Sequence, residues 1–146
     1  MSVNARDPDG GRTTVIDPLR KSMAVTAELF DLALREMRLG NLDRARASFR
    51  QAREQVVREG WGGLLPSICV VGAALVSAEG DHRQAAVLVG VAHTAFLKSG
   101  QAPDPGEVVE IARVSEAAVN ALGAQQFAAE SARGRRAGPS SIVFEI

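Results

Sequence analysis

The chain is poor in the residues that most often build β-sheets, disulfides and catalytic centres. It contains no tyrosine, one cysteine and two histidines among 146 residues, and aromatic residues make up 4% of it. It also lacks long alternating runs of β-branched residues, which argues against a strand-rich sandwich. The lone cysteine, Cys69, excludes a disulfide or a cysteine metal cluster within one chain, and its apolar sequence neighbours predict a buried thiol.

Neither sign of charge dominates. The 17 lysine and arginine residues are balanced by 17 aspartate and glutamate residues, so no overall field favours nucleic acid or an acidic membrane as the main partner. The apolar, uncharged stretch over residues 64–78 is shorter than the about 20 residues that a bilayer requires. The N-terminus lacks the basic start and apolar segment of a secretory signal, and we expect a cytoplasmic protein with no membrane partner.

What the chain has in quantity is alanine, valine and leucine at helical spacing. Phe30, Ala33 and Met37, for example, fall on one face of a predicted helix. Residues 65–79 are apolar nearly all round, which is typical of a helix in the middle of a domain. Gly90 and the alanines around it would let neighbouring helix axes approach closely. The pattern predicts an all-α protein of about six helices.

Two stretches about 40 residues apart share the same order of residues. Gly40-Asn41 and Gly80-Asp81 each stop one helix and cap the next. Hairpins repeated in this way bury their apolar faces against one another. We therefore expect antiparallel helical hairpins stacked as a short tetratricopeptide-like α-solenoid. The predicted organisation is a flexible leader over residues 1–19, a repeat domain over 20–136 and a tail over 137–146.

The last third of the chain predicts one more hairpin. Asp104 before Pro105 is a strong start signal, because proline suits the first helical position. A fifth helix is predicted over residues 106–122 and a short sixth helix over 125–133. The expected inner face of the fifth helix consists of Val108, Ile111, Ala112, Val119 and Leu122. The final run, IVFEI, could add to a sheet edge, lie in a groove or stay disordered, and its apolar character favours docking.

The residues of this region also carry a family resemblance. They are Gly80-Asp81, the alanine-rich string over residues 85–92, Pro103-Asp104-Pro105, Leu122-Gly123 and Phe127-Ala128. This order resembles the C-terminal helical repeat region of large actinobacterial regulators, which pair a P-loop ATPase with tetratricopeptide-like repeats and often with a LuxR-type or adenylate-cyclase-type domain. The resemblance covers residues 39–135. It implies a helical scaffold that works in transcriptional or signalling regulation.

The catalytic and DNA-reading parts of those regulators have no counterpart in this sequence. The chain has no G-x-x-x-x-G-K-[ST] phosphate loop, no cyclase carboxylates that can be placed and no evident helix-turn-helix. The IVFEI tail also departs from the helical ending that is usual in that family. The resemblance therefore implies the scaffold alone.

The histidines do not suggest a catalytic or metal site. His82 and His93 lie about three turns apart on one predicted helix, too far to share a metal without other ligands. No serine, histidine and aspartate stand in an arrangement that their spacing supports as a triad. We expect no enzyme activity, no cofactor and no metal.

The candidate interaction surface is a row of arginines on the second predicted helix. Arg46, Arg50 and Arg53 fall on one face at i, i+4 and i+7. The readings are a solvated face, a patch for an acidic protein segment, or a nucleic-acid surface, which the lack of interleaved aromatic residues weakens. Arg133, Arg135 and Arg136 form a smaller basic cluster that is expected on a flexible tail.

Three hypotheses of function follow. The first is a non-enzymatic repeat module for protein–protein interaction, with a peptide or a second copy of the chain in the concave surface lined by the first helix of each hairpin. The second is a nucleic-acid-associated regulator that uses the basic face from Arg44 to Arg58. The third is a helical protein that binds a small apolar ligand near Cys69 and Phe96.

Overall fold

The computed structural model describes residues 16–139, with side chains from residue 23 onward. This part of the chain forms six α-helices and one short 3-10 turn, and it contains no strand. They are α1 (Ile16–Arg38), α2 (Leu42–Glu59), the turn η2 (Gly62–Leu64), α3 (Leu65–Ala78), α4 (His82–Ser99), α5 (Pro105–Leu122) and α6 (Ala124–Ala137). The predicted all-α class is confirmed. Residues 1–15 of the expected leader and the IVFEI run lie outside the described residues, whereas residues 16–19 belong to α1.

Two of the predicted helix starts carry the expected caps. At α5, Asp104 Oδ1 accepts a hydrogen bond from the Glu107 backbone N–H at 2.8 Å, and the Glu107 side chain accepts one from the Asp104 backbone N–H. At α4, Asp81 Oδ1 accepts from the Gln84 backbone N–H at 3.1 Å. Asn41 holds the same position before α2, but its side chain makes no capping bond. Such caps satisfy backbone groups that a helix end leaves without a partner.

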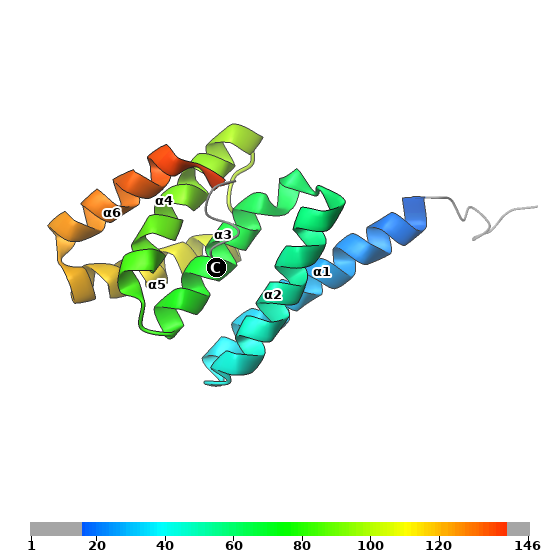
Figure 1. The fold of residues 1–146 in the computed structure, drawn as a ribbon, viewed down its shortest axis with the longest axis horizontal. Coiled ribbons are helices and arrows are strands. Elements are labelled where there is room, and N and C mark those ends of the chain that lie inside the picture. Colours follow the sequence, from blue (N-terminus) through cyan, green and yellow to red (C-terminus); the bar gives the residue numbers. More distant parts are fainter. Residues whose placement is uncertain (1–15, 140–146) are drawn as a thin grey trace, which may run out of the picture.

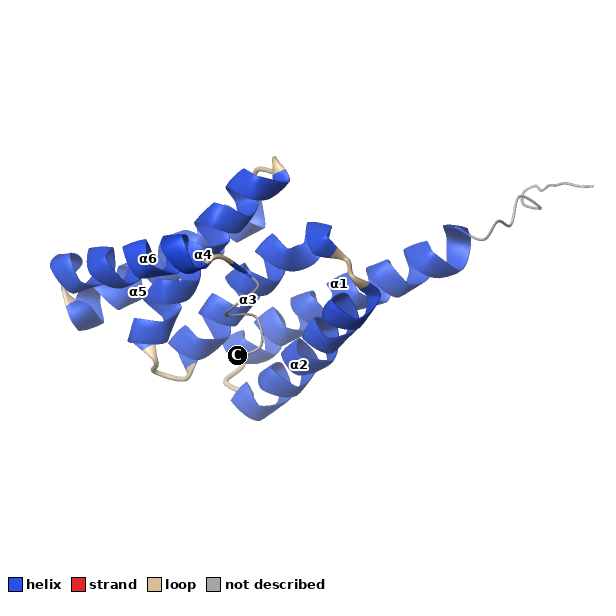
Figure 2. Cartoon of the chain, turned by 45° about the horizontal axis from the view of Figure 1, so that its top comes forward, coloured by secondary structure: helices blue, strands red, loops and turns tan. Residues whose placement is uncertain are grey.

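α3 lies near the centre of the six helices, and α6 packs mainly on α4. One end of the molecule is formed by α1 and α2 and the other by α5 and α6, with α3 and α4 between them (Figure 1, Figure 2). α3 packs against α1, α2, α4 and α5, and every residue from Ile68 to Val76 is buried. The prediction of a central helix is therefore confirmed. No helix in residues 16–139 is both long and apolar enough to cross a bilayer.

Two glycines bring α4 and α6 into backbone contact. A Cβ atom at Gly90 would overlap the carbonyl oxygen of Ser131, and one at Gly134 would overlap the carbonyl oxygen of Val87. The close approach expected at Gly90 is thus present, and its partner is Gly134. The short sixth helix was predicted to end before Gly134, but packing on α4 outweighs the low helix propensity of glycine and α6 continues to Ala137.

α5 turns a different face inward from the one that its apolar residues predicted. Val108 is 51% exposed, and Ala112 is exposed as well. The buried residues of this helix are Glu110, Val114 and Ala118, which form a neighbouring stripe. The predicted face was wrong at Val108 and Ala112, whereas Ile111 is half-buried against the core as expected. Glu110 can face inward because its pairing with arginines offsets the cost of burying its charge.

Candidate functional site

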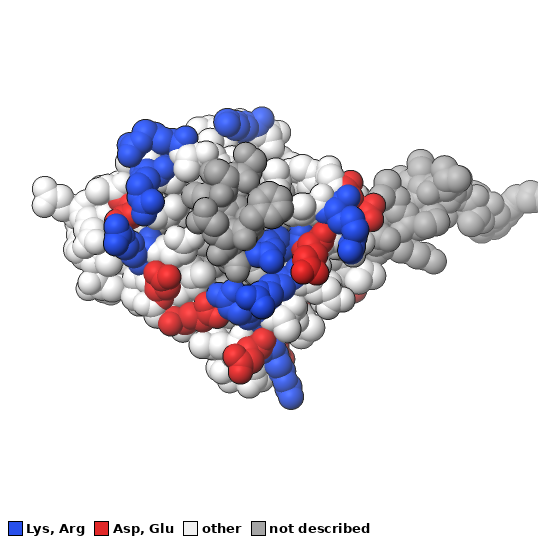
Figure 3. Space-filling view, in the orientation of Figure 1, with Lys and Arg blue, Asp and Glu red and all other residues white. Residues whose placement is uncertain are grey.

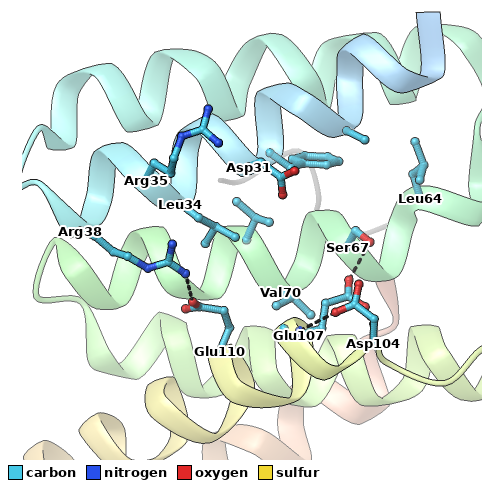
Figure 4. Close-up of a pocket in the computed structure, with 14 residues that line it drawn as sticks. Asp31, Leu34, Arg35, Arg38, Leu64, Ser67, Val70, Asp104, Glu107 and Glu110 are labelled. Carbon is cyan, nitrogen blue, oxygen red and sulfur yellow. Dashed lines mark hydrogen bonds and ion pairs between the residues drawn. The ribbon is translucent and has the colours of Figure 1, made fainter. Parts of the chain in front are cut away.

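The candidate site is a groove between α1, α3 and α5, called here the α1–α3–α5 groove. Its volume is about 550 Å³, and Figure 4 shows the residues that line it. The lining helices are the first, third and fifth of the described chain, so each comes first in its hairpin. The sequence predicts that a partner binds the surface lined by the first helix of each hairpin.

Apolar side chains make up much of the groove lining. They are Phe30, Leu34, Leu64, Val70 and Val71. Phe30 is buried, and the centroid of its ring lies 6.5 Å from that of Phe49 on α2, with the two planes tilted by 44°. Aromatic pairs at this separation stabilise a contact beyond the area that they bury. The α1 wall of the groove is therefore anchored to the helix behind it.

One end of the groove carries basic side chains of α1 (Figure 4). Arg38 Nη2 donates a hydrogen bond to Glu110 Oε2 at 2.9 Å, and Arg113 Nη2 donates to the other oxygen of the same carboxylate. Glu110 is 3% exposed, and a buried carboxylate is stable only when its charge is paired. Arg35, which also lines this end, has no ion pair with any described residue. Two arginines pair with Glu110 and Arg35 lies at the same end of the groove, so positive charge is in excess here.

The other end carries carboxylates from the start of α5. Glu107 Oε2 accepts a hydrogen bond from Ser67 Oγ of α3 at 2.8 Å, in addition to its part in the capping box with Asp104. Asp31 of α1 points into the groove between the two ends (Figure 4). The groove therefore has an apolar lining, a basic end and an acidic end. An elongated ligand with complementary charges would bind it in one direction.

The predicted arginine surface lies on α2, outside the groove. Arg46 is bound to Glu79 at the end of α3, with Arg46 Nε donating to Glu79 Oε2 at 2.7 Å. This hydrogen bond raises the pKa of Arg46 above its ordinary value. Arg50 is exposed and Arg53 partly exposed. Figure 3 shows basic and acidic side chains interleaved over the face where α2 lies. Part of the arginine row therefore joins α2 to α3, and its role in binding stays a prediction.

The other basic cluster is not on a tail. Arg133, Arg135 and Arg136 all lie in α6, and Arg133 shares the buried Glu130 with Arg83 of α4. The flexible-tail prediction for these residues was wrong, because α6 extends past Gly134 to pack on α4.

The remaining candidate residues do not converge. Cys69 is fully buried in α3, and burial raises the pKa of its thiol to about 12. Cys69 does not line the α1–α3–α5 groove. His82 begins α4, and His93 lies exposed further along the same helix. In the part of the chain that the structure describes, no three histidine, cysteine or acidic residues are grouped so that they could hold a metal.

Two residues that define the ends of the groove were not predicted from the sequence. Glu107 could have been found, because an acidic residue three positions after the Asp104 cap is the signature of a capping box. Glu110 could not, because its principal partner Arg38 is 72 residues away in the sequence.

The comparisons with known proteins give no match. No protein-family model fits the chain, and no similar protein was found among curated proteins or solved structures.

Proposed function

We propose that this chain is a non-enzymatic, short tetratricopeptide-like solenoid that binds a peptide segment of a partner protein in the α1–α3–α5 groove. The observation that carries the proposal is the position of the groove along the first helix of each hairpin. In a stack of hairpins this surface is continuous, so one extended or helical peptide can contact several hairpins at once.

The groove chemistry supports a peptide as the ligand. Its apolar lining suits two or three apolar side chains, and its charged ends suit a segment with an acidic residue toward Arg35 and a basic residue toward Glu107. The contacts of Glu107 and Glu110 already fix the groove walls. Preorganised walls reduce the entropy cost of binding. A role in transcriptional or signalling regulation rests on the resemblance to repeat regions of actinobacterial regulators.

The test compares two charge-reversal variants that change the net charge of the protein by the same amount. Arg35→Glu changes an exposed arginine of the groove, whereas Arg50→Glu changes an exposed arginine of α2. We expect a protein captured from the native host by the wild type to be retained by Arg50→Glu and to bind Arg35→Glu at least about tenfold more weakly, since one charged contact is worth on the order of 1.5–3 kcal/mol. Circular dichroism checks that both variants fold.

Each other outcome has a definite meaning. If Arg50→Glu loses the partner and Arg35→Glu keeps it, the arginine face of α2 is the binding surface. If the captured material is nucleic acid that is released as salt rises, the interaction is with phosphates and the proposal fails. If no protein is captured at any concentration of the wild type, the proposal also fails.

A further inference from the structure

A second pocket lies between α4, α5 and α6. Its volume is about 440 Å³, which falls within the range of roughly 300–1,000 Å³ that is usual for small-molecule sites. Its apolar walls are Val89, Phe96, Leu97, Pro103, Ile111 and Phe127. The residues after α4, including Gln101, close one side of it.

The charge of this pocket differs from that of the groove. Arg135 is the one permanently charged residue that lines it, and none of the described residues around it is acidic. The groove, by contrast, is lined by Asp31, Glu107 and Glu110. Arg135 is exposed and has no ion pair with any described residue. A guanidinium beside an apolar cavity can donate strong hydrogen bonds to an anionic group of a ligand, such as a carboxylate.

The backbone of Arg135 is held in place. Its carbonyl oxygen accepts a hydrogen bond from Thr94 Oγ1 of α4 at 2.9 Å, and its N atom lies at the glycine contact with Gly90. The base of the side chain is therefore fixed against the helix that forms the opposite wall. A charged group on a rigid element favours binding, because less motion is lost when the ligand arrives.

From this geometry we infer that the pocket binds a small organic anion with an apolar body, such as a carboxylic acid of medium chain length. The apolar body lies among Phe96, Ile111 and Phe127, and the carboxylate pairs with Arg135. This inference does not depend on the proposed peptide groove, which has no lining residue in common with this pocket. It shares Phe96 with the ligand site expected from the sequence, but Cys69 does not line this pocket.

The experiment pairs two probes with two variants. Decanoate and its neutral counterpart 1-decanol are titrated by calorimetry, at concentrations that leave the circular dichroism spectrum unchanged, into the wild type, Arg135→Gln and Arg136→Gln. Arg136 is the matched control, since it is exposed on the same helix but does not line the pocket. We expect decanoate to bind the wild type and Arg136→Gln equally and to bind Arg135→Gln about tenfold more weakly. Decanol should bind the three proteins alike.

The position of the ligand is read independently from amide chemical shifts. Decanoate should move the signals of Gln101, Ser115 and Ser131 and leave that of Ser67, in the groove, unchanged. The inference is overturned if decanoate does not bind, if the two arginine variants weaken it equally, or if the shifts appear around the groove instead.

Discussion

Two contacts between helices differ in how closely the helices approach: the α1–α5 contact, called here the open seam, and the α4–α6 contact, called the closed seam. In each of them a buried glutamate takes hydrogen bonds from two arginines, one of them on another helix: Glu110 links α5 to Arg38 of α1, and Glu130 links α6 to Arg83 of α4. Beside Glu110 the helices stay far enough apart to leave a groove. Near Glu130 two glycines let the backbones touch. Both seams have such an ion pair, so the size of the residues at the crossing accounts for the difference in how closely the helices approach.

Among these predictions, the largest loss of stability is expected when a side chain is added at the closed seam between α4 and α6. Gly134→Ala places a methyl group on the carbonyl oxygen of Val87, and we expect a loss of about 3 kcal/mol or more in the free energy of unfolding. The gain of up to about 1 kcal/mol that alanine normally brings to a helix is too small to compensate. Urea denaturation measures the difference. Gly62→Ala is the control, because its new Cβ meets open space and its backbone needs no positive φ, and it should change stability by less than about 0.5 kcal/mol.

The rate at which the Cys69 thiol reacts measures the effect of Gly134→Ala without denaturant. With the pKa of the buried thiol raised to about 12, the native protein should hardly react with a thiol reagent at pH 8, because the thiolate is the reactive form. Gly134→Ala should speed the reaction, since it populates opened states more often. Equal rates in Gly134→Ala and Gly62→Ala would show that the α4–α6 contact does not hold α3 in place.

The open seam should depend on its ion pair. Glu110→Gln removes the charge that joins α5 to α1, and we expect a loss of about 2 kcal/mol. In a double-mutant cycle with Arg38→Gln the coupling energy should be about 1 kcal/mol. Arg44→Gln, an exposed arginine with no ion pair to any described residue, serves as control. A coupling near zero would mean that side-chain packing alone sets the width of the groove.

Low pH should weaken the contact between α4 and α6, because Glu130 becomes protonated and loses its charge. Its pKa is lowered by the hydrogen bond from Arg133 and further by that from Arg83. A carboxylate whose folded pKa is lower than its unfolded pKa of about 4.3 stabilises the fold above that value and loses this contribution as pH falls through the folded pKa. The difference in unfolding free energy between wild type and Glu130→Gln should therefore be largest near pH 7 and shrink toward pH 3. A difference that is constant over this range would contradict the linkage.

The smallest effect is expected at the α2–α3 contact, away from both seams. The side chains of Arg46 and Glu79 are each 27% exposed, so their ion pair is screened by solvent. Arg46→Gln should cost less than about 1 kcal/mol in thermal unfolding experiments. Arg50→Gln should have no measurable effect, and equal losses in both variants would show that the Arg46 pair contributes nothing specific.

The sequence predicted the helices better than it predicted the seams between them. Helix ends follow from local signals, and Asp104 with Pro105 marked the start of α5 correctly. The inner face of α5 was misjudged because a helix with Val108 and Ala112 on one side looks apolar there, while the burial of Glu110 depends on Arg38 of a distant helix. Patterns within one helix carry no information about such a partner.

The same limit applied to the candidate site. The first helix of each predicted hairpin was expected to line a binding surface, and α1, α3 and α5 do line the groove. The charged ends of the groove were not predicted. The sequence predicted a close helix approach at Gly90, because glycine allows it, but it did not indicate that the neighbouring helix is α6. Gly134 was placed just after the predicted sixth helix, because glycine and arginines in succession are typical of a helix end.

The glycine contact also determines which substitutions the chain can tolerate. At Gly90 and Gly134 each side chain would strike backbone atoms, which cannot rotate away as a side chain would. A larger residue at either position therefore cannot be rescued by a smaller side chain nearby, because the nearest atoms that it would strike belong to the backbone of Ser131 or Val87, which every residue carries. In a survey of all single substitutions these two positions should accept none of the other nineteen amino acids, while the exposed residues around them accept most.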